Sequence, residues 1–270
     1  MLNIIPIPAF SDNYIWMLQR DNLKQVVLVD PGDEGKVIAF LQQHALQPVA
    51  ILITHQHYDH TGGVARLVKQ YPEIKLFCQN TAVSEKPLSI DLPVADFITH
   101  PVVDGDTVDI NELDIHFKVM TIPGHTLDHV AYFGEGVLFC GDTIFGCGCG
   151  RLFSGTAEQM TASMERLSVL PATTRVYTAH EYTLDNIGFA RWVEPDNADL
   201  IQRDQEDMAK QEKGIPTVPS LLGTELKTNP FMRYKIPQVK QAAEQYMGHS
   251  LHTDAEVFAA IRLWKDKEYD

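Results

Sequence analysis

The segment 54–60 constrains this chain of 270 residues more than any other feature of its sequence. It reads Thr-His-Gln-His-Tyr-Asp-His and directly follows the apolar run Val49–Ile53, which is typical of a buried strand. Alternate side chains of an extended segment share one side, so His55 and His57 can bind the same ion. The aspartate and the last histidine follow in a turn that Gly62-Gly63 permits, and they can reach a neighbouring point. The pattern predicts a metal site on a loop between a strand and a helix.

Three more candidate donors share one property: each closes an apolar run that predicts a strand. They are His125, Asp142 and His180. A histidine or aspartate that ends several strands is the pattern expected of a site built along one end of a sheet. With these donors the chain has enough imidazole and carboxylate ligands for two divalent ions.

Short strands alternate with helices through the first two thirds of the chain, with turn residues between them. This interleaving, together with hairpin-like pairs of strands, favours an α+β fold in which two sheets have helices on their outer faces. The expected strands span residues 3–8, 14–19, 26–30, 49–54, 113–120, 130–133, 137–140 and 176–179. The expected helices in this part span residues 35–44, 64–70 and 157–167.

The character of the sequence changes near residue 185, beyond which helices are expected. The proline-rich stretch 215–219 and Asn229-Pro230 separate them. The expected helices span residues 184–192, 198–213, 238–247 and 254–267. We therefore predict two domains, a metal-binding catalytic domain of residues 1–185 and a small helical domain of residues 186–270.

Charge and cysteine content argue against several classes of protein. The formal net charge is −14, so the chain repels a phosphate backbone and nucleic acid is not an expected partner. No apolar run reaches the roughly 18–20 residues that a membrane span needs, and the first residues lack the basic start of a signal peptide. The four cysteines form no Cys-x-x-Cys pair, which favours reduced thiols. We expect a cytoplasmic monomer.

Several motifs together resemble one family of hydrolases. The His-x-His-x-Asp-His pattern with the later histidines and aspartate is similar to the metallo-β-lactamase superfamily, whose members share a four-layer αββα sandwich. Within it the chain resembles the glyoxalase II, or hydroxyacylglutathione hydrolase, family almost from end to end. The motifs that carry this are Asp12-Asn13-Tyr14, Cys149-Gly150-Arg151, Asn229-Pro230-Phe231-Met232-Arg233, and Arg262 with Lys265 and Asp266. The resemblance implies an αββα sandwich followed by a small helical domain that binds glutathione.

The resemblance also implies a role for each residue of the metal site. It assigns His55, His57 and His125 to a first ion, Asp59, His60 and His180 to a second, and Asp142 to a bridge between the two. Donors of this kind, without thiolate, suit two Zn ions, with Fe or Mn as alternatives.

The reaction that the resemblance implies is hydrolysis of S-D-lactoylglutathione to D-lactate and glutathione, a step of methylglyoxal detoxification. A hydroxide bridging the two ions would attack the thioester carbonyl, and the oxyanion would stay near the cations. A thiolate, with a parent pKa of about 8.5, leaves without a strong general acid. Asp59 and Asp142 are the expected catalytic carboxylates.

The glutathione contacts implied by the family are Arg151, Phe153, Tyr182, Arg262 and Lys265. Arg262 and Lys265 stand at i and i+3 of an expected helix, so they share one face and can meet the same carboxylate. Phe153 occupies a position where many relatives have tyrosine, which removes one hydrogen bond to the substrate.

Asp128 is a second position at which the chain differs from the family that it resembles, because that family usually has glycine there. An aspartate tolerates a positive φ less well than glycine does, and its carboxylate can perturb the metal pocket or hydrogen-bond His129. We expect His129 to support the site from outside the ligand set, with simple core packing as the alternative.

Other functions of the same fold remain as alternatives. A lactonase, the main alternative, would leave the cationic C-terminal helix without a role, and a β-lactamase would be expected to carry a signal peptide. A nuclease conflicts with the acidic composition. A persulfide dioxygenase would lack some ligands of the second ion, and a metal- or thiol-binding module without turnover would lack at least one ligand.

Overall fold

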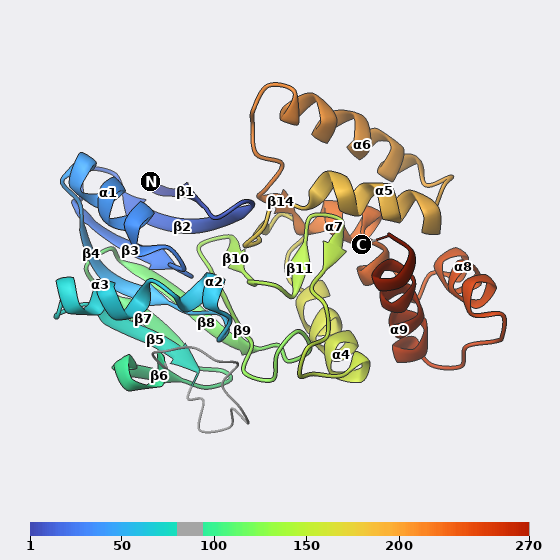
Figure 1. The fold of residues 1–270 in the computed structure, drawn as a ribbon, viewed down its shortest axis with the longest axis horizontal. Coiled ribbons are helices and arrows are strands. Elements are labelled where there is room, and N and C mark those ends of the chain that lie inside the picture. The colour runs from blue at the N-terminus through green and yellow to red at the C-terminus, as the bar shows by residue number, and fades with distance from the viewer. Residues whose placement is uncertain (80–93, 270) are drawn as a thin grey trace. The chain divides into compact units, whose positions relative to one another are not determined.

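A computed structural model describes residues 1–79 and 94–269 of the chain (Figure 1). By their internal contacts the residues form two compact units. The first comprises residues 1–121 with 126–141, and the second comprises residues 122–125 with 142–270. The predicted boundary near residue 185 lies inside the second unit, and the division into a catalytic and a helical domain stays a prediction.

The first unit opens with a sheet of six strands in the order β1-β2-β3-β4-β5-β6. The first three strands are antiparallel neighbours, and from β3 to β6 the pairing is parallel. The carboxyl ends of β3 and β4 therefore lie at one edge, where parallel sheets carry their ligand sites. The strands are β1 Leu2–Ala9, β2 Asn13–Arg20, β3 Gln25–Val29, β4 Gln47–Leu52, β5 Lys75–Gln79 and β6 His100–Val102.

A second set of strands in this unit forms an antiparallel meander in the order β10-β9-β8-β7. Glu135 and Gly136 both have positive φ, of 53° and 74°, which is the two-residue turn that the twist of a hairpin favours. The hydroxyl of Tyr132 donates to the carbonyl oxygens of Ile53 at 3.0 Å and Phe77 at 3.3 Å, which ties β9 to the first sheet. The strands are β7 Thr107–Ile110, β8 Ile115–Thr121, β9 Val130–Gly134 and β10 Val137–Phe139.

Helices cover one face of the six-stranded sheet. Val37 and Leu41 of one helix pack with Val64 and Leu67 of another in a single core cluster with the sheet. The side chain of Asp33 accepts from the Lys36 amide and caps the first of these helices. The helices of this unit are α1 Glu34–His44, α2 Tyr58–Thr61, α3 Val64–Gln70 and the 3₁₀ turn Val94–Phe97.

The second unit is mostly helical. Two capping boxes, Thr156 with Gln159 and Thr253 with Glu256, begin the helices Ala157–Ser168 and Asp254–Trp264. Its strands form two short antiparallel pairs, β11 Ile144–Phe145 with β12 Gly148–Cys149 and β13 Arg175–Tyr177 with β14 Ser220–Leu221. Its helices are α4 Ala157–Ser168, α5 Thr183–Val193, α6 Ala198–Gln211, α7 Leu222–Thr228, the 3₁₀ turn Pro230–Met232, α8 Pro237–Met247, α9 Asp254–Trp264 and the π-helical turn Lys265–Tyr269.

A buried ionic network fixes the β11–β12 hairpin to two of these helices. Arg203 of α6 lies 2.7 Å from Glu225 of α7 and 3.2 Å from Asp207, and all three side chains are almost fully buried. The same Glu225 accepts hydrogen bonds from the Cys147 amide at 2.9 Å and from the Asn229 side chain at 3.1 Å. The hairpin is therefore held through side chains that lie far from it in the sequence.

The expected elements agree with most of the observed ones. The helices expected in the first two thirds of the chain form within a few residues of their predicted bounds, and α5, α6 and α8 do so in the last third. The last helix ends at Trp264, and the chain continues as a π-helical turn. Helix α7 and strands β5, β6 and β7 were not predicted. No helix among the described residues is both long enough and apolar enough to cross a bilayer.

Candidate metal centre

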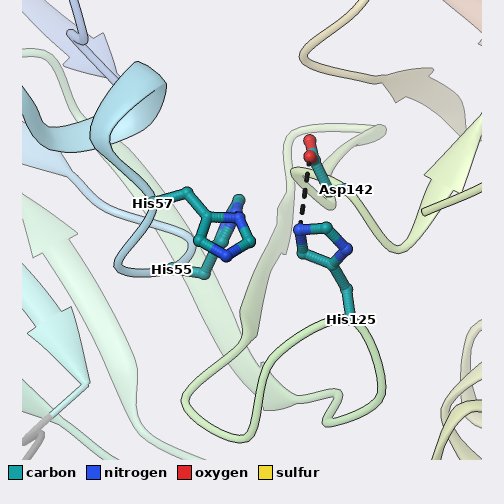
Figure 2. Close-up of side chains that lie close together, drawn as sticks. All are labelled: His55, His57, His125 and Asp142. Carbon is teal, nitrogen blue, oxygen red and sulfur yellow. Dashed lines mark hydrogen bonds and ion pairs between the residues drawn. The ribbon is translucent and has the colours of Figure 1, made fainter. Parts of the chain in front are cut away.

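The loop after β4 holds its first two histidines against each other (Figure 2). Nε2 of His55 lies 3.0 Å from Nδ1 of His57. The other ring nitrogen of His55 is 3.1 Å from the hydroxyl oxygen of Thr54, and that hydroxyl donates at 2.7 Å to Asp30. Because the hydroxyl proton is used in this way, we assign the His55 proton to Nδ1. Nε2 of His55 then carries a lone pair toward His57, as a metal ligand requires.

Asp30 supports a second histidine of the same loop. One of its carboxylate oxygens lies 3.0 Å from Nδ1 of His60, and the other accepts from the Thr54 amide at 2.8 Å. This leaves Nε2 of His60 facing Asp59, whose carboxylate is 3.3 Å away. Asp59 in turn accepts from the side-chain amide of Asn13 at 2.8 Å. Both ligand candidates are thus oriented by groups that do not themselves belong to the predicted ligand set.

Asp142 lies between two histidines. Its Oδ2 is 3.4 Å from Nε2 of His125, as Figure 2 shows, and its Oδ1 is 3.4 Å from Nε2 of His180. Nδ1 of His125 lies 2.7 Å from the carbonyl oxygen of Arg151, so this nitrogen donates and Nε2 is the nitrogen left to bind a metal. A buried carboxylate that turns one oxygen toward each of two imidazoles has the arrangement of a bridging ligand.

Gly150 permits the close packing around this carboxylate. Its amide donates to the Asp142 carbonyl oxygen at 3.0 Å. A Cβ at position 150 would stand 2.1 Å from that oxygen and 2.7 Å from Nδ1 of His125, which no side chain tolerates. The glycine of the Cys-Gly-Arg motif is therefore required by contact with two candidate ligands.

Aromatic rings pack on the histidines of the second unit. Tyr182 stacks on His180 with ring centroids 4.8 Å apart and an angle of 8° between the planes. Phe145 meets His180 edge-on at 5.5 Å, and Phe153 meets His125 edge-on at 5.2 Å. Phe153 is 61% exposed. A ring beside a ligand and open to solvent can contact both the site and a substrate.

The seven predicted metal ligands fall into two groups of donor atoms. Within each group, the ligand atoms all lie within 4.8 Å of one another. The groups are His55, His57, His125 and Asp142, and Asp59, His60 and His180. Imidazole and carboxylate donors fit divalent Zn, Fe or Mn. Hydrogen-bond partners on the ring nitrogens that face away from the site hold the imidazoles in position. The role of each residue toward an ion stays a prediction.

No cysteine belongs to either group of donor atoms. All four cysteines of the chain are buried thiols. Burial raises the pKa of Cys149 to about 11 and that of Cys147 to about 12, so both stay protonated at neutral pH. This agrees with a donor set built from nitrogen and oxygen alone.

Asp128 and His129 both lie against the histidine loop. The φ of Asp128 is not positive, so the aspartate meets no strain at this position. Asp128 is buried, and this burial raises the pKa of its carboxyl group. His129 is fully buried and stacks on His55 at 4.6 Å with 12° between the rings. It supports a candidate ligand by direct ring contact.

The predicted glutathione contacts differ in exposure. The side chain of Arg151 is 56% exposed, and its Nε is 3.5 Å from Asp266. Arg262 is buried, with Nη2 2.8 Å from Asp266 and Nη1 donating to the Cys149 carbonyl oxygen at 3.0 Å. Lys265 is 7% exposed. The structure therefore brings two of the five, Arg151 and Arg262, to one carboxylate, and the role of all five in substrate binding stays a prediction.

Sequence reasoning missed Asp30, Thr54 and Asp266 as supports of the site. A signal for Asp30 existed, because it follows an apolar strand and precedes Pro31-Gly32, as His55 follows the next strand. The pairing of β3 with β4 brings these two positions to the same edge. The i, i+4 spacing of Arg262 and Asp266 is a local signal for that pair, whereas no local signal marks the contact of Asp266 with Arg151.

Comparison with known proteins places the fold of this chain in one class. Residues 10–180 match the model of the metallo-beta-lactamase superfamily, and residues 181–268 match that of the hydroxyacylglutathione hydrolase C-terminus. A solved structure, BLEG-1 B3 metallo-beta-lactamase, is similar with a TM-score of 0.61 and 24% identity, covering 86% of this chain and 99% of that one. The chain thus has the metallo-β-lactamase fold, as predicted.

Relatives that match nearly the whole chain place it in one family within this superfamily. The hydroxyacylglutathione hydrolase of Nitrosomonas eutropha is 46% identical over 98% of this chain and 99% of its own length. That of Alkalilimnicola ehrlichii is 44% identical over 99% of this chain and 100% of its own length. The chain belongs to the hydroxyacylglutathione hydrolase family and is a hydrolase, and its His/Asp cluster is a candidate site for divalent metal.

Proposed function

We propose that this hydrolase cleaves S-D-lactoylglutathione with water to give D-lactate and glutathione, using two divalent ions, most simply Zn. The observation that carries the proposal is the position of Asp142, with one oxygen 3.4 Å from His125 and the other 3.4 Å from His180. A lone metal site needs no carboxylate shared in this way. Membership of the hydroxyacylglutathione hydrolase family supports the choice of thioester.

The proposed ligands are His55, His57 and His125 for one ion, Asp59, His60 and His180 for the other, and Asp142 for both. Bound divalent ions supply Lewis acidity and lower the pKa of a water molecule toward about 7. The protein's part is to hold the ligands rigidly, through Asp30, Thr54 and the Arg151 carbonyl. Asp59, itself held by Asn13, orients the attacking water and accepts its proton.

The leaving group explains why the chain needs few further catalytic groups. Water adds to the thioester carbonyl, the C–S bond breaks, and the sulfur leaves as a thiolate whose parent pKa is about 8.5. A strong general acid is therefore unnecessary. Phe153 and Tyr182, beside His125 and His180, contact the substrate near the reacting carbonyl, while Arg151, Arg262 and Lys265 meet the carboxylates of glutathione. The helical part, residues 186–270, acts as the substrate-binding domain of a cytoplasmic monomer.

The test is a hydrolysis assay with the metal-loaded and the metal-stripped protein. S-D-lactoylglutathione is followed by loss of thioester absorbance, with a simple lactone and a β-lactam as parallel substrates. We expect rapid cleavage of the thioester alone, lost on stripping and restored by Zn, Fe or Mn. Turnover of the lactone alone would leave the metal-dependent hydrolase in place and overturn the glutathione thioester as its substrate.

A further inference from the structure

One carboxylate in the second unit, that of Asp266, receives two arginines from distant segments. Arg262 of α9 reaches it with Nε at 3.1 Å and Nη2 at 2.8 Å. Arg151, which follows the β11–β12 hairpin, reaches the same oxygen with Nε at 3.5 Å. Residues 151 and 262 are thus brought together by a group that lies between them.

Arg262 is held on its remaining sides as well. Its guanidinium carbon lies 5.2 Å from the centre of the Phe231 ring, and its Nη1 donates to the Cys149 carbonyl oxygen at 3.0 Å. Its side chain is 4% exposed, whereas that of Asp266 is 33% exposed. A guanidinium held by a carboxylate, a carbonyl oxygen and an aromatic ring has little freedom to reorient.

Arg151 is the less constrained of the two arginines. Its side chain is 56% exposed. An exposed arginine loses side-chain entropy when it is fixed in one position. A carboxylate that already limits its range reduces the part of this cost that falls on ligand binding.

The π-helical turn Lys265–Tyr269 adds a third cation. Lys265 is nearly buried, with Nζ 5.7 Å from the centre of the Tyr269 ring. π-Helical turns are rare and occur often at functional sites. Two positive charges, on Arg151 and Arg262, therefore meet the one negative charge of Asp266, and the same turn carries a third positive charge on Lys265. The balance suits a ligand with two carboxylates, as glutathione has.

We propose that Asp266 is a positioning residue for the acidic part of the substrate. It holds the guanidinium groups of Arg151 and Arg262 together before the thioester binds, so that the carboxylates of the tripeptide meet preorganised donors. The proposal rests on the proposed function and adds to it the group that organises the substrate's binding site.

Two roles of Asp266 predict opposite results for Asp266→Asn. If the carboxylate acted through its charge alone, its removal would tighten the binding of an anionic ligand. If it positions the arginines, its removal weakens binding although the net charge becomes more positive. Glu268→Gln is the matched control, because Glu268 is an exposed acid on the same turn and its loss changes the net charge equally.

The measurement is calorimetric titration of the metal-loaded, full-length protein with S-methylglutathione, a thioether that cannot be hydrolysed. We expect Asp266→Asn to raise Kd about tenfold, and Glu268→Gln to leave Kd unchanged or slightly lower. With S-D-lactoylglutathione, Asp266→Asn should raise KM about tenfold and change kcat less than about twofold. Asp266→Glu should restore most of the affinity, and a lactoyl thioester of N-acetylcysteamine, which has no carboxylate, should be cleaved equally by all variants.

An unchanged or lower Kd for Asp266→Asn would overturn the positioning role and leave the proposed function intact. Failure of the wild-type protein to bind S-methylglutathione would overturn the positioning role and the choice of glutathione together. If Asp266→Asn does not fold, Asp266→Ser, which also removes the carboxylate, is compared in wild-type and Arg151→Gln backgrounds. Dependence of its effect on Arg151 supports the coupling, and strictly additive effects contradict it.

Discussion

At the scale of single residues, the site is defined as much by its supports as by its ligands. In three of the five candidate histidine ligands, the ring nitrogen that faces away from the site lies against a supporting group. These groups are Thr54 for His55, Asp30 for His60, and the Arg151 carbonyl for His125. These contacts fix which nitrogen is protonated and how the ring is turned. A ligand set correct in type still fails if these supports are removed.

Replacing Gly150 by alanine tests this dependence. The new Cβ would stand 2.1 Å from the Asp142 carbonyl oxygen and 2.7 Å from the His125 ring. We expect at least one bound ion to be lost and the turnover rate to fall by about two orders of magnitude, because misplacement by about 1 Å costs that much. Elemental analysis and the thioester assay measure both. Gly35→Ala, at an exposed site in α1, is the control, and an equally small effect of both variants would contradict the requirement.

At the scale of secondary structure, local signals explain which elements the sequence predicts well. Helix α9 begins at a capping box, and α1 begins at an aspartate cap, so their starts are encoded within four residues. The loop that follows β4 is predicted for the same reason, since the strand and its histidines are adjacent in sequence. The elements that the sequence did not predict form through packing against residues that are distant in the sequence.

The network around Glu225 yields a prediction for this scale. Changing Glu225 to glutamine keeps the shape of the side chain but removes the buried negative charge opposite Arg203. We expect the free energy of unfolding to fall by about 3 kcal/mol, as for other buried pairs that lose one partner. Urea denaturation measures the loss. Glu212→Gln, at an exposed position at the end of α6, is the control, and an equal loss in the two variants would rule the network out as the cause.

How much of the site can be predicted from the sequence depends on how far apart the interacting residues lie along the chain. The seven ligands were named because each is a histidine or aspartate at the end of an apolar run, a local pattern that a known family shares. Asp30 supports His60 only through the parallel pairing of β3 and β4, and Asp266 meets Arg151 across 115 positions of sequence. Strands β5 to β7 are short, and their stability depends on neighbouring strands, so periodicity alone did not reveal them.

At the scale of the whole molecule, metal binding is coupled to folding. The proposed ligands are spread from residue 55 to residue 180, so an unfolded chain cannot present them together. Ions that bind the folded state alone stabilise it by RT ln(1 + [ion]/Kd), about 2.7 kcal/mol for a free ion at 100 times its Kd. The stability of this protein is therefore expected to depend on metal as well as on its cores.

Metal stripping and His180→Ala separate the two proposed ions. The wild-type protein should hold two equivalents of Zn and lose several degrees in Tm when stripped. His180→Ala should hold one equivalent and show a smaller decrease in Tm on stripping, because only one ion remains to be lost. Elemental analysis and calorimetry measure these quantities. Two tightly bound ions in His180→Ala would contradict the assignment of this histidine.

The tripeptide Cys149-Gly150-Arg151 connects the candidate metal centre to Arg262 through main-chain atoms. Its carbonyl oxygens accept from Arg262 and His125, and its central amide donates to Asp142. None of these bonds involves the Arg151 side chain. Mutation can therefore change the side chain at position 151, which we propose contacts the thiol carrier, while the hydrogen bond that orients His125 is kept. The fold allows substrate range to evolve separately from the hydrolytic chemistry.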